Sequence, residues 1–158
     1  MISNFPTKKI YNLGGLKNFK FIPFLDVAFQ PAIEQGKVTA ALTLVNGGTW
    51  LNGYATPETL NFKEECVATS DGNIYSQTIS GFVPGDLPEL IDLFQALEDL
   101  PILVQIADTR GQIRLVGSHG FPMTFAGTYD SGSNRSDAKG FNFRVSTNSI
   151  FRAPVYKP

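Results

Sequence analysis

Residues 86–117 read DLPELIDLFQALEDLPILVQIADTRGQIRLVG, and this stretch decides the fold class. Its first half carries one apolar stripe at helical spacing, formed by Leu90, Leu93, Phe94, Leu97 and Leu100. Asp86 and Glu89 match the capping-box pattern, with Asp86 as the expected N-cap. The pattern predicts a helix over about 87–100, and a helix that is apolar on one side only is expected to lie against a sheet.

Strand patterns lie on both sides of this predicted helix. Residues 102–107 form an almost continuous apolar run, which is typical of a strand covered on both faces. The turn at 108–111 leads back into a strand over 112–117. Upstream, 59–69 and 74–83 alternate in polarity around a Ser-Asp-Gly-Asn turn, which predicts a hairpin.

The first third of the chain carries weaker strand patterns. Residues 19–29 are rich in Phe, Leu, Ile and Val and are expected to be extended, with a break at Pro23. Residues 37–46 alternate, an Asn-Gly-Gly turn follows, and 49–54 would return as the second strand of another hairpin.

Together these patterns predict a mainly β fold, a sandwich or barrel of about eight to ten strands with one flanking helix. We expect residues 1–18 to form an extended arm and residues 19–158 to form a single β-rich domain. The polar stretch 130–140 is predicted to be a long exposed loop, of a length that is uncommon without a function.

Composition excludes several classes of partner. The chain has 158 residues and a formal net charge of -1, so it lacks the basic field that would hold a phosphate backbone. No stretch reaches the roughly 18 apolar residues of a membrane helix. No apolar run of the length of a signal peptide follows Lys8 and Lys9. We therefore expect no specific nucleic-acid binding, no membrane partner, and a location in the cytoplasm.

The charges are unevenly placed. The first twenty residues are basic, whereas the predicted helix is acidic. These segments are either two solvated faces or opposite poles that meet between neighbouring subunits. The charged loop is either a floppy surface loop or a segment that orders against a neighbouring subunit. The candidate subunit-interface residues are Lys8, Lys9, Asp92, Asp99, Arg135, Asp137 and Lys139.

No pattern of catalytic, metal or cofactor residues emerges. His119 and Cys66 are the only residues of their types, so one chain cannot build a zinc site of the usual composition. His119 is expected in a turn, and Cys66 is expected to be buried and inert on the strand face that carries Phe62. Trp50 and Tyr54 either stack on sugars or bases, or anchor a hairpin to the core. We predict a chain that is not an enzyme and takes no cofactor or metal.

The second half of the chain resembles small structural proteins of Bacteroidetes phages and phage-like gene clusters. That family carries a D-x-x-G-x-x-R-L-V-G hairpin, a P-[LM]-x-F strand and a polar D-[ST]-G…D-x-x-G loop before a last aromatic strand. The matching segments here are 108–117, 122–125, 130–132 and 137–140, with an earlier match over 62–85.

The resemblance implies a structural subunit of a virion or phage-tail-like particle, assembled in the host cytoplasm. Tail-tube and related ring proteins are β-sandwiches or barrels with one flanking helix, and they stack as rings through loops and terminal arms. The partners it implies are copies of the same chain and other particle proteins, in a tail tube, a tail completion ring or a baseplate ring. The alternative from a different class is a non-catalytic binding module for carbohydrate or a protein partner.

Overall fold

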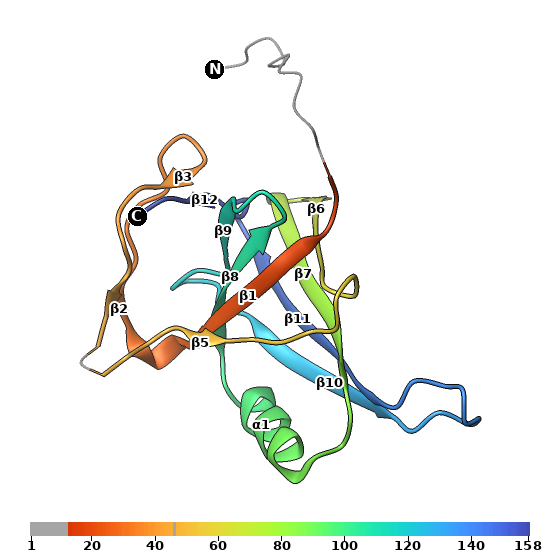
Figure 1. Cartoon of the computed structure of the whole chain (residues 1–158). Helices are drawn as coiled ribbons and strands as arrows, with labels where there is room; N and C mark the ends of the chain where they lie inside the picture. Colours follow the sequence, from red (N-terminus) through yellow and green to blue (C-terminus); the bar gives the residue numbers. More distant parts are fainter. Residues whose placement is uncertain (1–12, 46) are drawn as a thin grey trace.

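Twelve strands and one α-helix make up the fold in the computed structural model, which describes residues 13–45 and 47–158 (Figure 1). In chain order the elements are β1 (Leu16–Pro23), the 3-10 helix η1 (Phe24–Asp26), β2 (Val27–Phe29), β3 (Lys37–Val38), β4 (Thr43–Leu44), β5 (Leu51–Asn52), β6 (Asn61–Thr69), β7 (Gly72–Pro84), α1 (Pro88–Glu98), β8 (Ile102–Asp108), β9 (Ile113–Val116), β10 (Thr124–Asp130), β11 (Gly140–Ser149) and β12 (Val155–Tyr156).

Two large sheets and one small sheet organise these strands. The six-stranded sheet has the order β3-β12-β9-β8-β1-β5, and the four-stranded sheet has the order β10-β11-β7-β6. β2 and β4 form a separate two-stranded sheet. The predicted mainly β architecture with one flanking helix is confirmed. The structure has more strands than predicted, because the segment before β6 contains several strands of only two or three residues.

The main core lies between the two large sheets. Phe19 of β1 and Val116 of β9 meet Ile79 of β7 and Phe143 of β11 in one buried cluster. The rings of Phe125 and Phe143 stack 5.7 Å apart, centre to centre, so neighbouring strands of the four-stranded sheet are joined by aromatic contact.

The six-stranded sheet is covered on its other face as well. Leu103 and Leu115 lie on that face and pack with Val38 and Tyr156 in a second buried cluster. Val104, the next residue of β8, belongs to the main core. The prediction that β8 is covered on both faces is therefore confirmed.

α1 closes one end of the space between the large sheets (Figure 1). Its buried residues, Phe94 and Leu97, belong to the main core, as the apolar stripe predicted. Leu93, which the predicted stripe also included, is 45% exposed. The predicted N-cap is wrong: Leu87 occupies that position and no side chain caps the helix. Asp86 forms an ion pair with Lys139 instead, with 2.6 Å between Oδ2 and Nζ.

The hairpin predicted over residues 37–54 is also wrong. β3 pairs in parallel with β12, β4 pairs with β2, and β5 pairs with β1. On the side predicted to be apolar, Val38 and Leu42 are buried and Leu44 is half-buried, whereas Ala40 is exposed. Alternation carries no information about the partner strand, and partners distant in sequence replace the local one here.

β1 begins at Leu16, inside the segment that was predicted to be an arm. The strand ends at Pro23, where the break was expected. Lys8 and Lys9, two of the candidate interface residues, lie outside the described residues.

Candidate functional site

The acidic interface candidates lie on the helix side of the molecule. Asp92 is exposed on α1, and Asp99 is exposed at its C-cap. No ion pair engages either carboxylate within residues 13–45 and 47–158. Both charges therefore face solvent.

The loop between β10 and β11 is organised by its own carboxylates. Asp137 Oδ2 accepts the backbone N–H groups of Ser133 and Asn134, each at 2.8 Å. Asp130 Oδ1 accepts the N–H of Gly132, also at 2.8 Å. The hydrogen bonds from Asn134 and Ser133 lower the pKa of Asp137 below its ordinary value. These hydrogen bonds within the chain order the loop. The sequence had suggested either a floppy loop or a loop ordered by a neighbouring subunit, and neither interpretation included them.

The base of this loop is attached to the start of α1. The Lys139 carbonyl accepts the N–H of Gly85 at 3.0 Å, and the Lys139 ammonium pairs with Asp86. The hydrogen bond to Lys139 lowers the pKa of Asp86, and the same contact raises the pKa of Lys139. Arg135 is exposed and has no ion pair or side-chain hydrogen bond with another described residue. Of the three charged loop candidates, Arg135 is the one left for an external partner.

A buried polar cluster, missed from the sequence, joins β6 to the chain after β11. The Glu64 side chain is 8% exposed and accepts hydrogen bonds from Arg152, from the N–H of Ala153 and from Gln77, at 2.7 to 3.1 Å. The guanidinium of Arg152 also lies 4.6 Å from the centre of the Tyr75 ring. The sequence did place Glu64 on the inward face of an alternating strand, and this position could have indicated a buried carboxylate.

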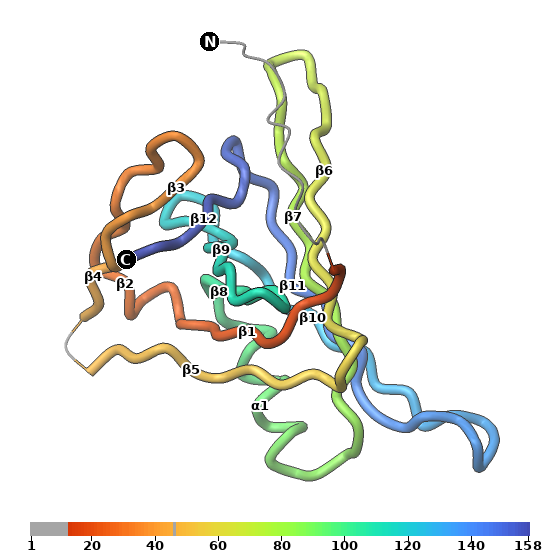
Figure 2. The backbone as a smooth tube through the Cα atoms, turned by 45° about the horizontal axis from the view of Figure 1, so that its top comes forward, coloured from red at the N-terminus to blue at the C-terminus, as the bar shows by residue number. Residues whose placement is uncertain are grey.

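The hairpin of β6 and β7 projects beyond the rest of the sandwich (Figure 2). Residues 65–73 are all exposed, including Cys66, which was predicted to be buried. That prediction was wrong because the inward face of β6 has a core beneath it only near Leu60 and Phe62. No backbone hydrogen bond joins the outer edge of β6 to another segment among the described residues. Within residues 13–45 and 47–158, the outer edge of β6 is therefore left without a backbone partner.

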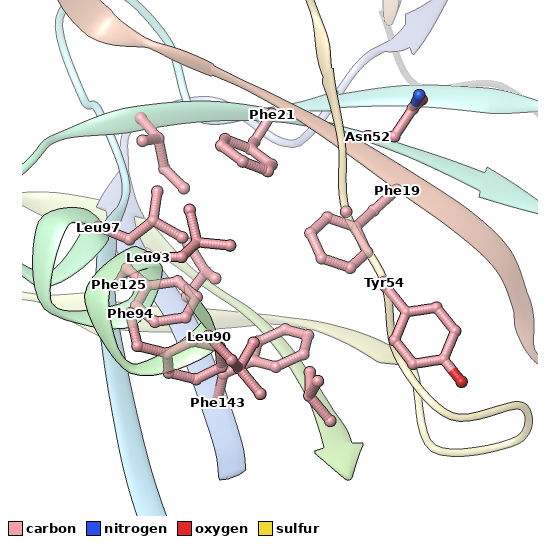
Figure 3. A pocket seen from close by; sticks show the side chains of 14 residues that line it. Phe19, Phe21, Asn52, Tyr54, Leu90, Leu93, Phe94, Leu97, Phe125 and Phe143 are labelled. Atoms are coloured by element: carbon pink, nitrogen blue, oxygen red, sulfur yellow. The ribbon is translucent and has the colours of Figure 1, made fainter. Parts of the chain in front are cut away.

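A partly open apolar cavity lies where α1 meets the two large sheets (Figure 3). It holds a free volume of ≈ 120 Å³. Its walls include Phe19 and Phe21 of β1, Phe94 and Leu97 of α1, and Phe143 of β11. The cavity is therefore an apolar pocket that is open on one side, and not a sealed void of the core.

Three of the rings that line the cavity rest on glycine backbone. A Cβ atom at each of these glycines would come closer than 3.0 Å to a ring. The pairs are Gly53 with Phe19, Gly81 with Phe143 and Gly127 with Phe94. Each ring occupies the place where a side chain at that glycine would lie, so these three positions require glycine.

The remaining aromatic candidates do not form a shared surface. Trp50 is half-buried and packs against the second core cluster, but the hairpin that it was expected to anchor does not form. Tyr54 is 59% exposed beside the cavity. His119 lies in a turn, as predicted, with its ring 4.7 Å from the ring of Phe24.

Among residues 13–45 and 47–158, no three His, Cys, Asp or Glu residues gather as metal ligands would. None of the helical structure described is both long and apolar enough to cross a membrane. No family model, curated protein or solved structure matches the chain.

Proposed function

We propose that this chain is a non-catalytic structural subunit that assembles with copies of itself into rings or a tube. The particle would be a phage virion or a phage-tail-like structure assembled in the host cytoplasm, with other particle proteins as further partners. One observation carries the proposal: the projecting β6–β7 hairpin exposes a long strand edge that no described segment covers (Figure 2).

The other sheet edges are shorter or covered. β3 and β5, at the edges of the six-stranded sheet, have two residues each, whereas β6 has nine. On β10, Gly127 donates its N–H to Glu98 of α1 at 3.1 Å. At the start of β10, Met123 exchanges backbone hydrogen bonds with Ile102. β6 is therefore the long edge that can accept a further strand.

The projecting part of the hairpin also gains from a partner. A two-stranded hairpin is only marginally stable in water, since it has no sheet or helix to pack against. Val67, close to its tip, is 43% exposed. Contact with a neighbouring subunit would cover this side chain and satisfy the edge groups of β6 together.

Charges along β6 limit which strand can add. Lys63 and Glu65 lie on the outward face and form an ion pair 2.6 Å apart. Charged side chains on an edge strand oppose indiscriminate pairing. A specific neighbour would therefore need a complementary charge pattern, which favours ordered assembly over aggregation.

Sedimentation velocity and electron microscopy of the purified chain at high concentration test the proposal. We expect species larger than a monomer, with rings or short tubes in the images. A strictly monomeric protein without rings or tubes would contradict assembly by this chain alone.

A proline pair tests the β6 edge. Successive strand residues direct their N–H groups to opposite edges of the strand, and proline has no N–H. Of the two variants Glu65→Pro and Cys66→Pro, one therefore removes an N–H on the outer edge of β6. The other removes an N–H that donates a hydrogen bond to β7. The variant with the wild-type melting temperature is the outward one, and we expect it to remain monomeric. If that variant assembles as the wild type does, the β6 edge is not the interface.

A further inference from the structure

We propose that the cavity beneath α1 is a binding site for one uncharged apolar ring, aromatic or branched aliphatic, of about the size of benzene. The site is separate from the β6 edge, so it goes beyond the assembly role and does not depend on it. Three features support this site: the volume of the cavity, the chemistry of its walls and the way it opens to solvent.

The volume matches a single ring. The cavity holds ≈ 120 Å³ of free space. An apolar cavity of about 150 Å³ lined by Leu, Ile and Phe stays dry and accepts benzene. The walls here are Phe, Leu, Ile and Val side chains of both sheets and the helix, which is the same chemistry.

The walls that the described residues give the cavity are almost entirely apolar. Figure 3 shows the amide of Asn52 and the hydroxyl of Tyr54 directed away from the space between Phe19, Phe21 and Leu93. A polar group buried there would lose its hydrogen bonds to water without replacement. The ligand part that enters the cavity is therefore apolar.

The rim disfavours anions. Leu93 lines the cavity and is 45% exposed, so it marks the side of α1 that opens to solvent. Glu89 lies one helical turn before Leu93 and is exposed, which places a negative charge beside the opening. A ligand with a carboxylate next to its ring should bind more weakly than its neutral or cationic analogue.

Two sources could supply such a ring: a free small molecule, or a side chain presented by a second copy of this chain. The chemistry at the cavity is the same for both. A side chain of a second copy would enter the cavity only when subunits assemble, whereas a free small molecule would enter it in either state.

Titration of the full chain with benzyl alcohol, benzylammonium and benzoate, followed by methyl chemical shifts in NMR spectra, tests the site. We expect benzyl alcohol to saturate the shifts with a Kd of about 1 mM or tighter, and benzoate to bind more weakly than benzylammonium. The shifted methyl signals should be those of Leu90, Leu93 and Val145, which line the cavity.

Leu93→Trp fills the opening, and Ile91→Trp is the matched control, because Ile91 is 46% exposed on the same helix and does not line the cavity. We expect Leu93→Trp to weaken benzyl alcohol binding by at least about tenfold, whereas Ile91→Trp leaves it unchanged. The absence of saturable binding to the wild type, or an equal effect of the two variants, would overturn the site.

Sedimentation with and without saturating benzyl alcohol then identifies the source. If benzyl alcohol dissociates assembled protein, the natural occupant is a side chain of a second copy. If assembly persists in saturating benzyl alcohol, the natural occupant is a free small molecule. The same holds if benzyl alcohol binds a chain that stays monomeric throughout. A chain that is always monomeric would refute the assembly role, whereas the binding site would stand.

Discussion

Filling the cavity beneath α1 should stabilise the protein. The cavity holds a free volume of ≈ 120 Å³, which leaves room for additional side-chain atoms on its walls. Val145 of β11 is 1% exposed and lines the cavity. Val145→Ile adds one methylene and keeps the β-branch that suits a strand.

The expected gain is that of one buried methylene, about 0.8 kcal/mol. For a chain of this length, about 1 kcal/mol shifts the melting temperature by roughly 2–4 °C. The melting temperature of Val145→Ile should therefore rise by about 1–3 °C in calorimetry or thermal circular dichroism.

Val116→Ile is the control for this prediction. Val116 is 0% exposed and belongs to the same core cluster, yet it does not line the cavity. An extra methylene in a filled site costs about 1–3 kcal/mol, so this variant should melt at a lower temperature than the wild type. If Val145→Ile and Val116→Ile are destabilised alike, the space beneath α1 is not available to a side chain and the reasoning fails.

Two further predictions concern the polar contacts. Glu64→Ala should lower the free energy of unfolding by about 2–4 kcal/mol in denaturant titrations, because Glu64 is buried and its donors would lose their acceptor. Glu65→Ala is the comparison, and it should cost less than about 1 kcal/mol, since its ion pair is exposed; equal losses would contradict the assignment. The pKa values of Asp86 and Asp137 lie below the ordinary value of 3.8, as the hydrogen bonds from Lys139 and from two backbone N–H groups favour their charged forms. The contacts of a carboxyl group with a lowered pKa are fully present above its unfolded value and are lost as the pH falls through the folded value. The amide shifts of Ser133 and Asn134, which donate to Asp137, should therefore titrate with a midpoint below pH 3.8; a midpoint at or above pH 3.8 would refute this.

Features that depend on neighbouring residues in the chain could be predicted from the sequence. The β6–β7 hairpin, the doubly covered strand β8 and the amphipathic helix all follow from local periodicity and turn residues. The pairings of β3, β4 and β5 could not be predicted, because each takes a partner other than the adjacent strand pattern. Periodicity reports which side of a strand is apolar and leaves the partner open.

The candidate sites depend on contacts that are distant in the sequence. Glu64 is buried because Arg152 and Ala153 reach it from the other end of the domain. Cys66, two residues further along the same face of β6, is exposed because none of the described residues forms a core beneath that part of the hairpin. The alternation of β6 alone treats both residues alike, so it cannot separate a buried carboxylate from an exposed thiol.

The wall of the cavity and the charged loop share one helix. Phe94 of α1 packs on Gly127 of β10, and the neighbouring contact from Gly127 to Glu98 fixes the end of the helix. The ion pair between Asp86 and Lys139 connects the start of the helix to the base of loop 130–140. Contacts to β10 and to the loop between β10 and β11 therefore hold the two ends of α1.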